Sequence, residues 1–307
     1  MAIDTEAARI LLAAAREGVS FASCITLGRQ NYVPGNHESR LLLRETGFDP
    51  AQYPDLFAGA PGHRYAEPFF RVLGAQRLES MDASAFEGAT VVHDLNQPVP
   101  EALRGQFDVV YDGGTLEHVF DFQTAIRNCV DLVKIGGRVI LHTPANNYFG
   151  HGFYQFSPEL FYRMFCSDNG FVMERMIAME YGPRRRWFEV RDPASLRART
   201  QLVNPFPVLL YVQARKQDES KLFERCPQQS DYARIWLEHG QAAPDRQSAV
   251  SARAGLVPAV KRLLLERAPT LARMLETFLS SPCNRGCSFR NRVAFQRLRK
   301  PLPIGPR

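Results

Sequence analysis

Several acidic and glycine residues stand directly after short apolar runs, at positions where they could bind a ligand. Residues 107–111 (FDVVY) form a β-branched and aromatic run that is typical of a buried strand, and Asp112-Gly113-Gly114 ends it. Asp82 and Asp94 each follow a shorter run of the same kind. Carboxylates accept strong hydrogen bonds from ligand groups, and glycine leaves room for a ligand beside the backbone. These positions are therefore the first candidates for a binding site.

Two further polar residues, Glu117 and His118, come just after this glycine turn. Histidine can change its charge near neutral pH, so His118 is a candidate general base. Equally, it could cap or pack against the helix that follows. Glu117 is a candidate for contact with the substrate.

The segment 146–157 (NNYFGHGFYQFS) combines flexible glycines with aromatic and polar side chains. His151 is a second candidate base, and Tyr154 and Gln155 are candidates for contact with a substrate. The alternative is a structural loop that uses its aromatic rings to cover a sheet.

The elements that must position these residues follow from the pattern of apolar residues. After Gly114 an apolar-periodic helix is expected, and Gly136-Gly137 ends it before another buried strand at 138–141. This strand–helix–strand unit predicts a parallel sheet, in which ligands bind outside the carboxyl ends of the strands. We expect an α/β fold with a doubly wound, mostly parallel, Rossmann-like seven-stranded sheet. Its strands are expected at 21–27, 77–81, 90–93, 107–111, 138–141, 171–179 and 207–214.

The composition is that of an ordinary soluble protein, with 307 residues, 45% hydrophobic and 23% charged. No run approaches the roughly 18 apolar residues of a membrane span. Acidic and basic residues within 3–17 favour a helix over a signal peptide. Six scattered cysteines, without a CxxC pair, a His-Cys cluster or an HExxH motif, predict no metal site and suit a reducing cytoplasm.

The chain divides by charge into a body and a basic tail. Residues 246–307 carry 13 Lys and Arg against two acids. We expect one domain over 1–216, with an insertion or cap at about 31–64, and a basic, mostly helical extension over 217–307. Two amphipathic helices expected at 257–267 and 269–279 could lie on an anionic membrane surface, or pack on the domain or on a second subunit. Nucleic-acid binding is less favoured because stacking aromatic residues are sparse there.

Strands that end in turn at Gly28, Asp82, Asp94 and Asp112 resemble those of class I S-adenosylmethionine-dependent methyltransferases, over about residues 20–215. The resemblance is strongest to a broad group that contains ubiquinone-biosynthesis-like enzymes and methyltransferases of bacterial glycan and secondary-metabolite clusters. It implies S-adenosylmethionine as the cofactor.

The resemblance also implies a role for each strand end. The turn with Thr26 and Gly28 would pass under the methionine moiety, and Asp82 would hold the ribose hydroxyls. Asp94 and Leu95 would bind adenine. Asp112, Gly113 and Gly114 would contact the methionine end. The chain departs from the family pattern in having Gly28 alone, followed by Arg29 and Gln30, and a long gap before Asp82.

These features predict methyl transfer to an oxygen or nitrogen of a small-molecule or glycan-type acceptor. We expect a cytoplasmic protein, which could contact the inner membrane face through its tail and could form a homodimer. The alternative is a catalytically inactive Rossmann-like scaffold or partner subunit, which the thinned first turn favours. A nicotinamide-dependent oxidoreductase is disfavoured because the chain lacks GxGxxG.

Overall fold

The computed structural model describes residues 2–58, 64–220, 222–224, 226–240, 268 and 285–300. The two amphipathic helices expected at 257–267 and 269–279 lie outside the described residues, so their predicted contacts with a membrane or a subunit stay predictions. Within the described residues, no helix combines the length and apolar character that a membrane crossing needs.

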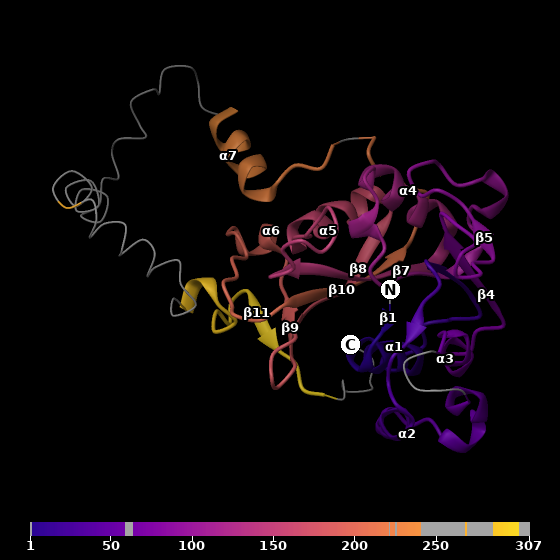
Figure 1. The fold of residues 1–307 in the computed structure, drawn as a ribbon. Coiled ribbons are helices and arrows are strands. Elements are labelled where there is room, and N and C mark those ends of the chain that lie inside the picture. Colours follow the sequence, from indigo (N-terminus) through magenta and orange to yellow (C-terminus); the bar gives the residue numbers. More distant parts are fainter. Residues whose placement is uncertain are drawn as a thin grey trace.

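A nine-stranded sheet runs through the molecule (Figure 1). Its order is β11-β9-β8-β10-β7-β6-β2-β4-β5. The strands from β5 to β7 are mutually parallel, whereas β10 is antiparallel to both β7 and β8, and β9 is antiparallel to β8 and β11. The α/β class is therefore confirmed, but the sheet is mixed and is larger than the expected seven strands. The strands are β2 (Ser23–Leu27), β4 (Arg77–Asp82), β5 (Val91–Val92), β6 (Phe107–Asp112), β7 (Val133–Asn146), β8 (Phe171–Glu180), β9 (Arg186–Val190), β10 (Val208–Lys216) and β11 (Phe295–Arg297).

The two unexpected strands, β9 and β11, form one edge of the sheet. The last strand expected from the sequence was 207–214, but Phe295–Arg297 of the C-terminal extension also pairs with β9. A strand this short has no periodic signature of its own. The Phe289 ring stacks on Phe188 at 4.0 Å and meets Phe295 edge-on, so contacts between distant segments stabilise this edge.

Helices cover both faces of the sheet (Figure 1). On one face lie α1 (Thr5–Arg16), α2 (Asn36–Glu45) and α3 (Glu67–Val72), and on the other α4 (Phe122–Leu132), α5 (Pro158–Met164) and α6 (Pro193–Leu196). Side chains alternate accordingly. Ile140 of β7 joins the core that contains α1, whereas its neighbours Val139 and Leu141 join the core that contains α4. This is the doubly wound arrangement that the sequence predicted.

The segment expected as an insertion or cap packs on α1. It contains β3 (Asn31–Tyr32), which pairs with β1 (Ala2–Ile3), then α2 and two short 3-10 helices at Pro50–Gln52 and Pro54–Phe57. Leu42 and Leu43 of α2 are buried in the same core as α1. The Arg9 guanidinium of α1 contacts the Glu45 carboxylate at 3.1 Å. Residues 31–58 therefore extend the layer of α1.

The C-terminal extension is described in two parts. Helix α7 (Ser230–Gly240) follows the body, and its first residue donates from its backbone N–H to the Glu159 carboxylate of α5 at 2.8 Å. Residues 285–300 return to the sheet through the 3-10 helix Arg285–Cys287 and β11.

Candidate functional site

The parallel strands bring the predicted acidic residues to one edge of the sheet. Leu27, the last residue of β2, pairs with Met81 of β4 and with Asp112 of β6. The Gly28 N–H donates to the Met81 carbonyl at 2.6 Å, and the His93 N–H donates to the Asp82 carbonyl at 2.8 Å. The strand ends that precede Gly28, Asp82, Asp94 and Asp112 therefore share this edge.

Asp112 is completely buried at the carboxyl end of β6. Its Oδ1 accepts a hydrogen bond from the Thr115 N–H at 2.8 Å, but its Oδ2 has no hydrogen-bond partner among the described residues. Burial and the nearby Glu117 carboxylate raise the pKa of Asp112 well above its usual range. A buried acid with a free oxygen is costly unless a donor or a cation binds there.

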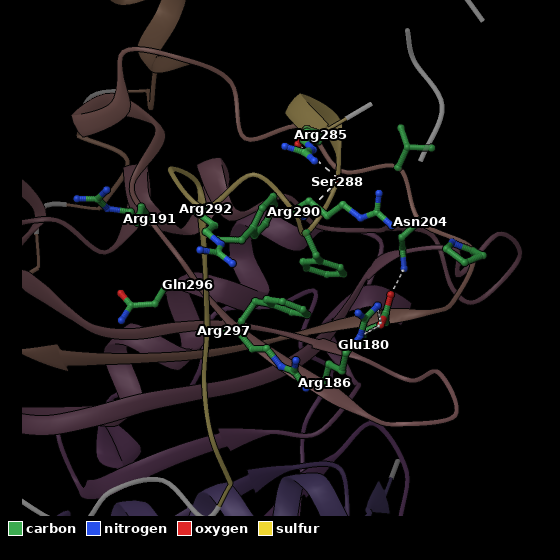
Figure 2. Close-up of a pocket in the computed structure, with 15 residues that line it drawn as sticks. Glu180, Arg186, Arg191, Asn204, Arg285, Ser288, Arg290, Arg292, Gln296 and Arg297 are labelled. Atoms are coloured by element: carbon green, nitrogen blue, oxygen red, sulfur yellow. Dashed lines mark hydrogen bonds and ion pairs between the residues drawn. The ribbon is translucent and has the colours of Figure 1, made fainter. Parts of the chain in front are cut away.

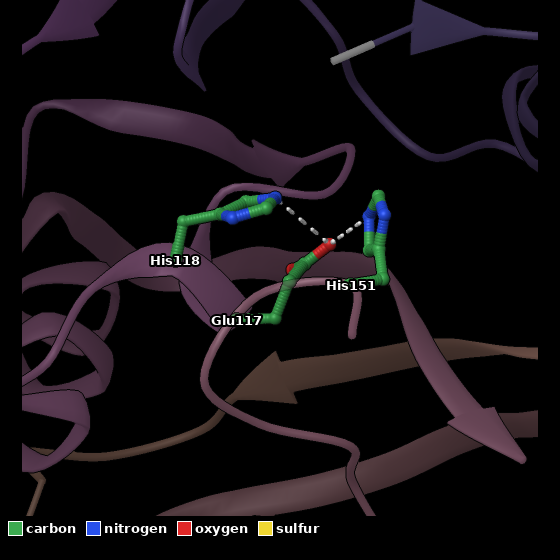
Figure 3. Close-up of side chains that lie close together, drawn as sticks. All are labelled: Glu117, His118 and His151. Atoms are coloured by element: carbon green, nitrogen blue, oxygen red, sulfur yellow. Dashed lines mark ion pairs between the residues drawn. The ribbon is translucent and has the colours of Figure 1, made fainter. Parts of the chain in front are cut away.

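Glu117 is a second buried carboxylate, in the 3-10 helix Leu116–His118 that follows the glycine turn. Its side chain is 1% exposed, and its Oε2 lacks a hydrogen-bond partner in the described part of the chain. Burial raises the pKa of Glu117 as well. Figure 3 shows His118 and His151 on either side of its Oε1, with their Nε2 atoms at 4.0 and 3.5 Å.

The loop after β7 is held against this 3-10 helix, which explains why His151 meets His118. The Glu117 carbonyl accepts from the backbone N–H of Phe153 at 2.7 Å and of Tyr154 at 3.3 Å. Between them and His151 lies Gly152, with φ +78°, where a Cβ would come within 2.7 Å of the same carbonyl. The two imidazole rings are 5.1 Å apart, and burial followed by the charge of His151 lowers the pKa of His118.

The predicted substrate residues Tyr154 and Gln155 have polar atoms that hold this loop in shape. The Tyr154 hydroxyl donates to the Phe120 carbonyl at 2.6 Å. The Gln155 Oε1 accepts from the Tyr148 N–H at 2.9 Å. The described contacts therefore give both residues a positioning role, and their contact with an acceptor stays a prediction.

Asp82 and Asp94 each accept hydrogen bonds from a local turn through one carboxylate oxygen, Oδ1. The Asp82 Oδ1 accepts from the Ser84 N–H at 3.2 Å. The Asp94 Oδ1 accepts from the N–H and the side-chain amide of Asn96 at 2.9 and 2.7 Å, and these bonds lower the pKa of Asp94. Leu95 is buried in the core that contains helix α4. The turns leave the second carboxylate oxygens available to a ligand.

The first turn contains a residue whose role the sequence did not reveal. The Thr26 hydroxyl donates to the Gly28 carbonyl at 2.8 Å, and the Gln30 side-chain amide donates to the Leu27 carbonyl at 2.7 Å. The Gln30 Oε1 is buried without a partner, and a Cβ on Gly113 would come within 2.3 Å of it. Gln30 therefore fills the space between the carboxyl ends of β2 and β6.

Arg29, which lies between Gly28 and Gln30, is held away from this space. Its guanidinium pairs with the Glu67 carboxylate of α3 at 2.6 Å and lies 3.6 Å from the centre of the Tyr65 ring. The single glycine of the turn, Gly28, adopts φ +69°.

Glu117, His118 and His151 have ligand atoms within 4.8 Å of one another and could hold a metal ion. The sequence predicted no metal site because it contains no closely spaced set of metal ligands. Here the third ligand comes from the next strand end, so local spacing gave no signal.

No family model matches the chain, and no curated protein matches it. Similar solved structures include 1,6-didemethyltoxoflavin-N1-methyltransferase of Burkholderia thailandensis with bound S-adenosylhomocysteine, which is 14% identical, with 70% of this chain and 78% of that chain covered and a TM-score of 0.36. The branched-chain polyamine synthase of Thermus thermophilus, in complex with 5'-methylthioadenosine, is 14% identical, with 71% of this chain covered and a TM-score of 0.36. The YcgJ protein of Bacillus subtilis is 11% identical, with 69% of this chain and 99% of that chain covered and a TM-score of 0.37.

The chain spans 57% of the length of the polyamine synthase.

Proposed function

We propose that the chain is an S-adenosylmethionine-dependent methyltransferase that acts on an oxygen or nitrogen of a small-molecule acceptor. The observation that supports this most is the pair of buried carboxylates, Asp112 and Glu117, whose free oxygens lie at the carboxyl end of β6. Folding gains nothing from two such acids close together. A positively charged ligand would neutralise them.

The residues at the strand ends fit the parts of this cofactor. The free oxygens of Asp82 and Asp94 suit the hydroxyl and amino groups of an adenosine. The free Asp112 Oδ2 and Gln30 Oε1 suit an amino group, and both are negative or polar acceptors near where a sulfonium would lie. When bound, the cofactor supplies an electrophilic methyl group, which leaves the sulfur as a neutral thioether.

The acceptor side lies around His118 and His151. Their imidazoles are about half exposed, so a nucleophile on an acceptor can reach them, and either ring could take the proton that the nucleophile loses. The Phe120 and Phe153 rings, 73% and 65% exposed and 5.7 Å apart, provide an apolar surface beside them. This combination supports a partly apolar acceptor, and a glycan-type acceptor would have to use the same aromatic surface.

The second candidate is a Rossmann-like scaffold without catalysis, which the position of Gln30 favours. Its buried side chain lies against Gly113, where the methionine end of a cofactor would pass. If Gln30 blocks this space, the wild type will not bind the cofactor and Gln30→Ala will.

Thermal shift and calorimetry with S-adenosylmethionine, its demethylated product and NAD test the proposal. We expect saturable binding of the first two, because a ligand that binds only the folded state raises the melting temperature. Asp82→Ala and Asp94→Ala should each weaken binding, while Asp168→Ala, an exposed acid in the 3-10 helix Ser167–Asn169, should not. Binding with no methyl transfer to any of a panel of phenols, amines and sugars would favour the scaffold.

A further inference from the structure

We propose that Glu117, His118 and His151 form a binding site for a divalent transition-metal ion on the acceptor side of the site. Two imidazole nitrogens and one carboxylate oxygen are a ligand set that suits zinc, manganese, iron or cobalt. Three protein ligands leave coordination positions open, as catalytic metal sites require.

The distances suit a single ion. Ligand atoms bound at about 2.0–2.2 Å from one metal lie roughly 3–4 Å from each other. The Glu117 Oε1 is 3.5 Å from the His151 Nε2 and 4.0 Å from the His118 Nε2, and all of the ligand atoms lie within 4.8 Å of one another. Because both imidazoles are about half exposed, small side-chain rotations can close the remaining gap.

The surroundings of Glu117 also point to a cation. Its carboxylate is buried and its Oε2 is unpartnered, and the nearby Asp112 is a second buried acid with an unpartnered oxygen. The Nε2 atoms of both histidines face the same Glu117 oxygen (Figure 3). An ion bound there would neutralise the buried acid, whose Oε2 has no hydrogen-bond partner among the described residues.

This inference deepens the proposed function and changes the role of the histidines. As ligands, their Nε2 atoms would be occupied, so neither would take a proton from the acceptor. The ion would instead bind the acceptor oxygen through an open position and favour its deprotonated form, with the proton lost to solvent. An acceptor with two adjacent oxygens would bind best, because it could fill two open positions.

The test measures metal binding apart from activity. The full chain is stripped with a chelator, and Zn²⁺ and Co²⁺ are titrated by calorimetry and by the visible absorption of Co²⁺. We expect one site, and a loss of affinity of about tenfold or more in His118→Ala and in His151→Ala, since even changes to groups behind a metal ligand cost about 10–100-fold. His37→Ala, an exposed histidine of α2, is the matched control.

A stoichiometric site that survives in the His118→Ala/His151→Ala double variant, or equal losses in His37→Ala, would overturn the metal proposal. Thermal melts of the stripped variants show whether each is folded. Cofactor binding is measured in parallel: absent metal binding with intact cofactor binding rejects the metal site alone, and the reverse rejects the methyl donor alone.

We further infer, from a separate region, that an arginine-lined cavity binds a ligand with two or more phosphate groups. The cavity has a volume of about 1110 Å³ and lies between β9, β11 and the segments that precede β10 and β11. Figure 2 shows Arg186 of β9 and Arg297 of β11 on one side of the cavity. Arg285, Arg290 and Arg292, from the segment that precedes β11, lie on the other side. Its arginines are Arg186, Arg191, Arg285, Arg290, Arg292 and Arg297.

The charges in this cavity are largely uncompensated. Its one acid, Glu180, is buried at the end of β8 and is paired with Arg186, with Asn204 donating to its other oxygen at 3.3 Å. Among the described residues, Arg290, Arg292 and Arg297 have no ion-pair partner. A guanidinium group can donate two parallel hydrogen bonds to the oxygens of one phosphate. The summed positive charge of these arginines exceeds the negative charge of a single phosphate, so a ligand with two or more phosphates fits better.

Calorimetry with inorganic pyrophosphate, ADP and UDP tests this site at two salt concentrations. We expect binding that weakens about tenfold or more in Arg290→Ala/Arg292→Ala and is unchanged in Arg184→Ala, an exposed arginine outside the cavity. Tighter binding of the nucleotides than of pyrophosphate would add a nucleoside to the ligand. Equal losses in Arg184→Ala, or no binding of any of the three, would overturn the inference.

Discussion

Replacement of Asp112 by asparagine should make the protein more stable and less able to bind its ligand. The substitution keeps the size of the side chain and the hydrogen bond that Oδ1 accepts from the Thr115 N–H. It removes a buried negative charge whose second oxygen is unpartnered. Leaving such a group unsatisfied costs about 1–3 kcal/mol, and more when it is charged.

The effect should depend on pH in a definite direction. The pKa of Asp112 is raised in the folded protein by burial and then by Glu117, so the folded state keeps a proton that the unfolded state loses. This contribution to stability is complete below the unfolded pKa of about 4 and is lost as the pH rises through the folded value. The variant lacks it, so its advantage over the wild type should grow from acidic to mildly alkaline pH.

Urea unfolding at several pH values between 4 and 8.5 and calorimetry with S-adenosylmethionine measure both effects. At the alkaline end we expect a gain of about 1–3 kcal/mol, together with a loss of affinity of roughly 10- to 100-fold, since a hydrogen bond to a charged group contributes about 1.5–3 kcal/mol. Asp168→Asn, at an exposed acid, should change neither quantity. A variant that is less stable than the wild type at every pH would refute the argument that Asp112 is kept for binding.

Three further substitutions test the packing around the site and the sheet edge. Gly152→Ala should lower stability by about 1–3 kcal/mol, because it combines φ +78° with a Cβ 2.7 Å from the Glu117 carbonyl; an unchanged urea midpoint would show that the loop is not held against Glu117. Arg186→Ala should cost about 1–3 kcal/mol by leaving the buried Glu180 with Asn204 as its remaining partner, while Arg184→Ala should be neutral. Phe289→Ala removes a ring stacked at 4.0 Å on Phe188 and should cost about 2–4 kcal/mol, with faster hydrogen exchange in β11; exchange equal to that of the wild type would contradict the stack as the support of that strand.

The parallel half of the sheet was predictable because its information is local. The run Phe107–Asp112 is mostly apolar and is followed by glycine, and β2, β4 and β7 carry similar signals. The strands, and the polar residues at their carboxyl ends, could therefore be predicted from the sequence. The edge strands β9 and β11 were not predictable in this way. Arg186 and Trp187 begin β9 in a segment where the sequence predicted no strand. The inner neighbour of β9 is β8, which directly precedes it, but its outer neighbour β11 lies more than a hundred positions later.

The site divides along the same line. The positions of Asp82, Asp94 and Asp112 could be predicted because each lies at the end of its strand or just after it. The burial of Glu117 depends on a loop that follows the next strand, and its Oε1 meets two histidines from different segments. The sequence also did not predict that the Gln30 side chain packs against Gly113. Such contacts arise from the crossing of segments, which spacing along the chain does not encode.

The edge strand β11 also bears on how the protein is made. Phe295–Arg297 pair with β9, and the Leu298 N–H donates to the Trp187 carbonyl of the same strand at 3.0 Å. Lys300 then donates to the Glu6 carboxylate of α1. During synthesis, β9 leaves the ribosome about a hundred residues before its partner, so its outer backbone groups stay open to other nascent chains in the meantime. A chain truncated before residue 295 should therefore aggregate. A chaperone that binds the exposed edge of β9 should raise the yield of the folded full-length chain.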